Sequence, residues 1–217
     1  MSTENTMRHI RHFFWDFDGT LFDTYPIIIQ ILRRSLGEFG HDCDPMDAMK
    51  QMLDSIGAAQ IHYAQTFAIP LEELKSVYRR HRTQETEELL SKPFPDVERV
   101  LAGIVEKGGK NYIFTHRKER ETRDYLKKYG LESCFEDILG NESEGFATKP
   151  APDALLYLME KHDIDPAQAV MVGDRDCDLG SGRNAGLQIA HFVCAAFPEN
   201  LECDWRFTSF SEMLTML

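Results

Sequence analysis

The chain has 217 residues, of which 42% are hydrophobic and 28% charged, and its formal net charge is −12. This length suits one domain, or one domain with a smaller insert, and the composition excludes wholesale disorder. The acidic balance argues against a nucleic-acid-binding protein, which usually has a basic face, and the apolar runs are too short to span a membrane. An anionic small-molecule substrate stays open, because one metal ion and a few cations can reverse the local charge.

The five cysteines are scattered along the chain and form no Cys-x-x-Cys pair. This pattern argues against a disulfide framework and a zinc site and favours a reducing compartment. The first residues are polar and contain no apolar signal-peptide segment, so we expect a cytoplasmic protein. We expect a monomer or a weak homodimer, with no nucleic-acid partner and no membrane partner.

The first predicted elements are a buried strand and a block of helices. The segment from Ile10 to Phe17, with the hydrophobic run from His12 to Trp15, is typical of a buried strand. Asp23-Thr24-Tyr25-Pro26 then carries the signals of a helix start, and apolar residues keep helical spacing up to Gly40. Further helices are predicted within residues 46–90, and this block contains no strand signal.

From Pro93 onward, predicted strands and helices alternate. The predicted helices cover residues 97–107, 117–129, 152–162 and 176–185, and a last helix starts at Ser209 or Ser211. The predicted strands cover residues 111–114, 137–139, 169–172 and 187–193. The alternation predicts an α/β fold with a doubly wound parallel sheet, built from residues 1–23 and 93–217. Residues 24–92 are predicted to form an inserted α-helical domain.

Polar residues gather in the loops of this predicted sheet. Asp16 and Asp18 follow the first strand, Thr115-His116-Arg117 follows the second, Thr148-Lys149-Pro150 precedes a helix, and the segment Gly173–Asp178 follows a later strand. In a parallel sheet with right-handed crossovers such strand ends point the same way, so these side chains would converge on one crevice. Two carboxylates as close as Asp16 and Asp18 suggest a metal ion, a phosphoryl group or both.

The order of these segments resembles the haloacid dehalogenase (HAD) superfamily. The resemblance rests on Asp-x-Asp-Gly-Thr-Leu from Asp16, a strand ending in Thr115, Lys149-Pro150, and Gly-Asp-Arg-x-x-Asp from Gly173 to Asp178. It is strongest to the phosphoglycolate phosphatase-like and β-phosphoglucomutase-like branch, in which a helical cap lies between the first two motifs. The resemblance implies a Rossmann-like HAD core, a cap domain at residues 24–92 and a small phosphorylated metabolite as substrate.

The resemblance also implies roles for the acidic residues. Asp16 would attack phosphorus to give an aspartyl-phosphate, and Asp18 would be the general acid and then the general base. Magnesium would be held by the carboxylates of Asp16 and Asp174 and by the backbone carbonyl of Asp18. Asp178 would stand behind this site, holding metal-bound water or Lys149.

Three further residues are expected to bind the substrate phosphate, namely Thr115, His116 and Lys149. His116 has an alternative interpretation as a helix cap, with Arg117 at the surface. Arg175 is expected to pack or to form an ion pair within its own loop rather than to contact substrate.

The presence of Asp18 favours phosphate-ester chemistry, because dehalogenases and phosphonate hydrolases of the superfamily do not carry an Asp at this position. The alternatives are a phosphomutase of the β-phosphoglucomutase type and a phospho-binding module without turnover. Such mutases typically have a His at the position of Ile28 and often have Val or Ile at that of Thr20, so both positions favour a phosphatase. A receiver domain, the best-known binding module with similar residues, places its acidic pair before the Thr and Lys, whereas Asp174 follows Lys149 here.

Overall fold

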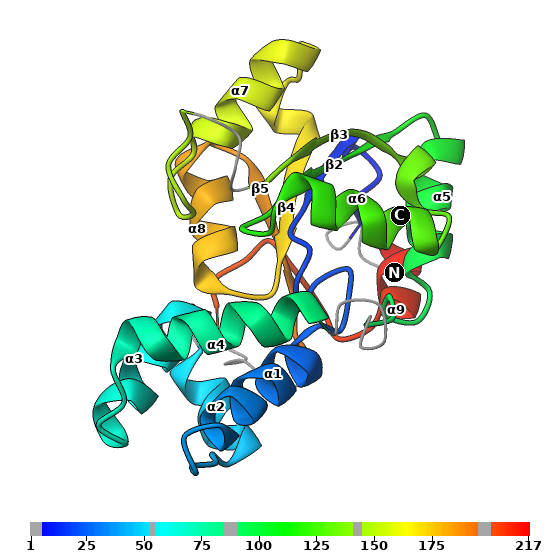
Figure 1. Cartoon of the computed structure of the whole chain (residues 1–217). Coiled ribbons are helices and arrows are strands. Elements are labelled where there is room, and N and C mark those ends of the chain that lie inside the picture. Colours follow the sequence, from blue (N-terminus) through cyan, green and yellow to red (C-terminus); the bar gives the residue numbers. More distant parts are fainter. Residues whose placement is uncertain (1–5, 53–54, 85–90, 141–144, 195–200) are drawn as a thin grey trace. The chain divides into compact units, whose positions relative to one another are not determined.

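The computed structural model describes residues 6–52, 55–84, 91–140, 145–194 and 201–217. The chain divides into two compact units, one made of Met1–Phe22 and Pro93–Leu217 and the other of Asp23–Lys92. The first unit has an α/β architecture, and the described part of the second is helical (Figure 1).

A parallel sheet forms the centre of the α/β unit. Within the described residues it has six strands in the order β3-β2-β1-β4-β5-β6, and every neighbouring pair is parallel. The strands are β1 His12–Trp15, β2 Lys110–Phe114, β3 Phe135–Leu139, β4 Ala169–Gly173, β5 Gln188–Phe192 and β6 Trp205–Phe207. This topology confirms the predicted doubly wound α/β fold.

Strand β6 has no counterpart among the predicted strands. Its side chains alternate, with Trp205 and Phe207 buried and Arg206 exposed, but the element is only three residues long. An alternation this short cannot be distinguished from a loop in sequence. The strand forms because its backbone pairs with β5, whose position depends on the rest of the sheet.

The helices lie where the sequence predicts them, with small differences at their ends. The α/β unit contains α5 Val97–Glu106, α6 Glu119–Lys128, α7 Asp153–His162, α8 Asp176–Asn184 and α9 Phe210–Met216. The helical unit contains α1 Tyr25–Gly37, α2 Pro45–Gln51, α3 Ile56–Thr66 and α4 Leu71–Gln84. The end of the predicted helical block, residues 85–90, lies outside the described residues. None of the described helices combines the length and the apolar character that crossing a membrane would need.

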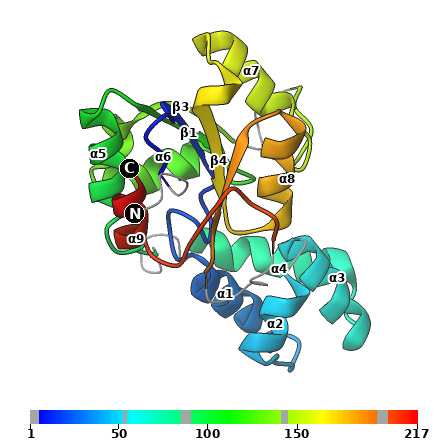
Figure 2. The ribbon, with the colours of Figure 1, turned by 180° about the vertical axis from the view of Figure 1, so that it is seen from behind.

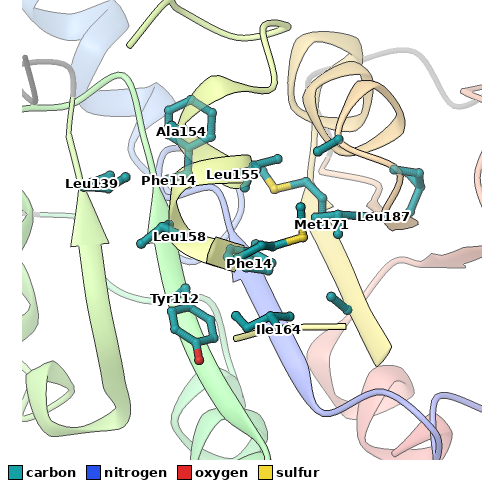
Figure 3. Packing of buried hydrophobic residues seen from close by; sticks show 14 of the residues in the cluster. Phe14, Tyr112, Phe114, Leu139, Ala154, Leu155, Leu158, Ile164, Met171 and Leu187 are labelled. Carbon is teal, nitrogen blue, oxygen red and sulfur yellow. The ribbon is translucent and has the colours of Figure 1, made fainter. Parts of the chain in front are cut away.

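Helices cover both faces of the sheet. Figures 1 and 2 show α7 and α8 on one side of the strands and α5, α6 and α9 on the other. Strands covered on both faces are largely apolar, and β4 is buried at every residue. Figure 3 shows the core between the sheet and α7, in which Phe14, Tyr112 and Met171 of the strands pack against Leu155 and Leu158.

Glycine allows α8 to approach the sheet closely. A Cβ added to Gly182 would lie 2.6 Å from Cβ of Met171 and 2.7 Å from Cδ1 of Ile189, so any side chain there overlaps the strands. Gly103, in the middle of α5, has nothing within 4 Å of the same position. The two glycines therefore have different reasons to be in a helix.

We predict that Gly182→Ala lowers the free energy of unfolding by about 1–3 kcal/mol, because overpacking outweighs the gain in helix propensity. Gly103→Ala is the matched control and should raise it by up to about 1 kcal/mol. Urea denaturation of both variants measures the two effects. Equal changes in the two variants would contradict the close approach of α8 to the sheet.

Candidate active site

The carboxyl ends of three neighbouring strands carry residues that the sequence singles out. Asp16 follows β1, Thr115 follows β2 and Asp174 follows β4. Strand β1 lies between β2 and β4 and pairs with both, so the three loops start side by side. The structure therefore brings these residues to the edge at which open α/β sheets bind ligands.

Three carboxylates are buried together at this edge. Asp16, Asp174 and Asp178 are each at most 1% exposed, and one oxygen of each lies within 4.8 Å of the others. Oδ2 of Asp16 is buried and has no hydrogen-bond partner among the described residues. Like charges this close are costly to bury unless cations compensate them. A cluster of carboxylate oxygens with an unused ligand atom fits a hard divalent cation.

Lys149 is a cation placed among these carboxylates. Its Nζ donates to Oδ1 of Asp16 at 2.6 Å and to Oδ1 of Asp178 at 2.9 Å, and its side chain is fully buried. Burial by itself would lower the pKa of the Lys149 ammonium, but the two carboxylates outweigh burial and hold the pKa above its ordinary value. Lys149 therefore stays protonated at neutral pH.

The pKa values of the two carboxyl groups that Lys149 contacts are shifted in opposite directions. Burial, followed by the charge of Asp178, raises the pKa of Asp16 to about 6, although Lys149 acts against this change. Burial also opposes ionisation of Asp178, but Lys149 and Arg175 outweigh it and hold the pKa of Asp178 below its ordinary value. Asp178 is thus the more readily ionised of the two, and Asp16 is the carboxyl group whose ionisation its surroundings oppose.

The start of α8 brings Asp178 back toward the end of β4. Oδ2 of Asp178 accepts a hydrogen bond from the backbone N–H of Arg175 at 3.1 Å. A Cβ added to Gly173 would lie 2.3 Å from Cβ of Asp178, so this approach requires glycine. Nε of Arg175 lies 3.9 Å from Oδ2 of Asp178, which is the ion pair expected within this loop.

Thr20 is a site residue to which the sequence analysis gave no role. Its Oγ1 donates to Oδ1 of Asp174 at 3.1 Å, and both side chains are buried. Oδ2 of Asp174 accepts a longer contact from Sγ of Cys194 at 3.5 Å. The place of Thr20 in the Asp-x-Asp-Gly-Thr segment indicates that it lies near the site. The sequence does not show that its partner is Asp174, which lies more than 150 positions away.

The loop after β2 contains Thr115 and His116. Oγ1 of Thr115 accepts from the backbone N–H of Arg117 at 3.1 Å and still has its own hydrogen to donate. Nε2 of His116 accepts from the backbone N–H of Lys149 at 3.0 Å, so this ring connects the β2 loop to the lysine loop. Burial, followed by the charge of Lys149, lowers the pKa of His116 to about 4, so the imidazole is neutral. The capping alternative for His116 is wrong, because α6 begins at Glu119 with Lys118 at the N-cap position.

The surface position expected for Arg117 is also wrong. Arg117 is 9% exposed, and its guanidinium donates to both oxygens of Asp18, from Nη2 to Oδ1 at 2.5 Å and from Nε to Oδ2 at 3.3 Å. Burial would lower the pKa of Arg117, but Asp18 outweighs it and raises the pKa. The sequence concealed this role because Arg117 begins a run of charged residues that resembles an exposed helix start.

The sequence profile of the haloacid dehalogenase-like hydrolases matches residues 13–192 of the chain. The phosphoglycolate phosphatase of Vibrio vulnificus is 30% identical over 203 residues, which cover 88% of this chain and 84% of that protein. Among solved structures, a predicted phosphoglycolate phosphatase from Haemophilus somnus superimposes with a TM-score of 0.84 at 21% identity, covering 96% of this chain and 98% of the other.

A HAD-superfamily hydrolase of subfamily IA from Geobacter sulfurreducens gives a TM-score of 0.74 at 19% identity, covering 100% of this chain and 99% of the other. The two structures agree with the fold described above, and the profile covers the strands and loops that carry the buried carboxylates, Thr115 and Lys149. The chain therefore belongs to the haloacid dehalogenase-like hydrolase family.

Proposed function

We propose that this protein is a magnesium-dependent phosphatase that hydrolyses small phosphomonoesters through an aspartyl-phosphate on Asp16. The observation that carries the proposal is the buried group of three carboxylates around Lys149, in which Asp16 has one oxygen without a hydrogen-bond partner among the described residues. A carboxylate nucleophile and compensating cations are what phosphoryl transfer through an aspartyl-phosphate requires.

The proposed metal ligands are the carboxylates of Asp16 and Asp174 and the backbone carbonyl of Asp18, with Asp178 behind them. Oxygen ligands favour Mg²⁺ over softer metals. When bound, the cation withdraws charge from the phosphoryl oxygens and reduces their repulsion by the carboxylates. Thr20 supports this role, because its hydroxyl fixes the orientation of Asp174.

In the first step, an oxygen of Asp16 attacks phosphorus and the bond from phosphorus to the leaving oxygen breaks. Asp18 gives its proton to that oxygen, so the product leaves as an alcohol. Lys149 and the hydroxyl of Thr115 bind the phosphoryl oxygens as charge develops on them. Lys149 suits this task, because its ion pairs keep it protonated and hold it in place.

In the second step, water attacks phosphorus and the bond from phosphorus to Asp16 breaks. Asp18, now ionised, takes the proton from water, and the products are inorganic phosphate and a free Asp16 carboxylate. Residues 24–92 are proposed to act as the cap that encloses the substrate and excludes bulk water. The imidazole of His116 is uncharged, so we assign it to the support of the Lys149 loop rather than to charge compensation.

The proposed substrate is a small phosphorylated metabolite, either a sugar phosphate or a compound similar to phosphoglycolate. The Vibrio vulnificus relative is named for phosphoglycolate, which supports this size class for the present chain. A phosphomutase fits less well, because Ile28 stands where such relatives typically place a histidine.

We expect Asp16→Asn to reduce turnover of every phosphomonoester by roughly 10³-fold or more, because the amide is not a nucleophile. Release of inorganic phosphate from sugar phosphates, phosphoglycolate and nucleotides, with and without EDTA, measures this loss. The control is Asp176→Asn, which changes a carboxylate at the first residue of α8 whose side chain is 74% exposed. Undiminished activity in Asp16→Asn would exclude the proposed nucleophile.

We expect Mg²⁺ affinity to fall below pH about 6 and to be nearly constant above it. The pKa of Asp16 is raised to about 6, so at lower pH this ligand is protonated and a neutral carboxyl group binds the cation poorly. Calorimetric titration of Mg²⁺ into the substrate-free protein at pH 5 and pH 7.5 tests this expectation. Equal affinities at the two pH values would argue against Asp16 as a ligand.

We expect Thr20→Val to weaken Mg²⁺ binding by about 10–100-fold with little change in the fold, because Asp174 loses one of the donors that orient it. Thr122→Val is the matched control, since Thr122 is a buried threonine of α6 whose hydroxyl donates to a backbone carbonyl. If both variants bind Mg²⁺ as the unchanged protein does, Thr20 has no role at the metal site.

A further inference from the structure

We infer that Arg117 is a positioning residue that orients the carboxylate of Asp18 for both of its proton transfers. The inference rests on the proposed function, in which Asp18 is the acid and then the base. It adds a residue whose side chain lies outside the group of carboxylates around Lys149.

The contact between Arg117 and Asp18 orients the carboxylate as well as compensating its charge. Two different nitrogens of the guanidinium donate to two different oxygens of the carboxylate, at 2.5 and 3.3 Å. Such a fork restricts the rotation of the carboxylate, whereas a lysine contact would leave it free to turn. The side chain of Arg117 is 8% exposed and that of Asp18 is 20% exposed, so the arginine lies behind the acid and part of the acid remains accessible.

The guanidinium is itself held by its surroundings. Its central carbon lies 5.5 Å from the ring centre of Phe17 and 4.9 Å from that of Tyr125, and Nη1 lies 3.5 Å from an oxygen of Glu121. Phe17 separates the nucleophile from the acid in sequence, so the arginine packs against the segment that carries both. A group held on several sides can transmit a fixed orientation to its partner.

The same loop is tied to the rest of the site. The backbone N–H of Arg117 donates to Oγ1 of Thr115 at 3.1 Å. A Cβ added to Gly140 would lie 2.6 Å from the backbone oxygen of Arg117, so the chain after β3 packs tightly under this loop. The fork therefore connects the acid to the loop that would bind the phosphate.

The fork still allows proton transfer. Each carboxylate oxygen has two lone-pair directions, and the arginine uses one on each oxygen. A remaining direction can carry the proton to the leaving oxygen in the first step and take a proton from water in the second. Without the fork Asp18 keeps its chemistry but loses two contacts that orient it, and misplacement of a catalytic group by about 1 Å can cost about 10²-fold in rate.

The test uses p-nitrophenyl phosphate, whose phenolate leaves without a proton. Formation of the aspartyl-phosphate from this ester does not need the acid, whereas its hydrolysis still needs the base. We expect Arg117→Met to form the aspartyl-phosphate at close to the normal rate and to hydrolyse it about 100-fold more slowly. Stopped-flow measurement in Mg²⁺ should show a burst of about one p-nitrophenolate per active site, and the ratio of burst rate to steady-state rate should rise about 100-fold.

Arg123→Met is the matched control, since Arg123 lies on α6 and pairs with Glu119 of that helix and with Glu132 beyond its end. The Arg123→Met variant should keep the ratio of burst rate to steady-state rate of the unchanged protein. Should Arg117→Met fail to fold, Arg117→Lys retains the charge and loses the fork, and its ratio should rise about 10-fold. A ratio equal to that of the unchanged protein in a folded Arg117 variant, including a parallel fall of both rates, overturns the inference.

Failure of the proposed function gives a different result. In that case the unchanged protein releases no p-nitrophenolate, or Asp16→Asn releases it equally fast. The inference fails alone if the unchanged protein is active, Asp16→Asn is inactive and the Arg117 variants keep the normal ratio.

Discussion

The ion pairs of Lys149 with Asp16 and Asp178 are the interaction on which the catalytic edge depends. Three carboxylates within a few ångströms of one another would repel strongly in a buried setting. A single buried ammonium in contact with two of them makes the arrangement possible. Breaking such a pair by removing one partner typically costs about 3–5 kcal/mol, so the lysine contributes to the integrity of this edge as well as to its chemistry.

The neighbouring cations give the acidic residues of the site different properties. Asp178 is the anion that keeps Lys149 in place, while Asp16 has a raised pKa and a buried oxygen without a hydrogen-bond partner in the described residues. Asp18 lies outside this group and faces a different cation, Arg117. Two acids one residue apart therefore have separate cationic partners, which matches the separate tasks that we propose for attack and for proton transfer.

Much of the fold could be predicted because its signals are local. Strand β4 is a continuous apolar run, β1 and β2 each end in three consecutive apolar residues, and turn or capping residues mark the ends of several helices. Strand β6 was not predicted, because an alternation over three residues is too short to indicate a strand. The order of the loops along the chain, together with the parallel sheet, was sufficient to place Asp16, Thr115 and Asp174 at one edge.

The sequence by itself determined which residue types reach the site and in what order. Only the tertiary structure decided their partners, because side-chain pairing depends on distances between loops that are far apart in the chain. Thr20 meets Asp174, His116 accepts from the Lys149 backbone, and Arg117 turns inward to Asp18. A charged run after a strand is typical of a solvent-exposed segment. The arginine is buried here because it pairs with Asp18 and packs against two aromatic rings on other segments.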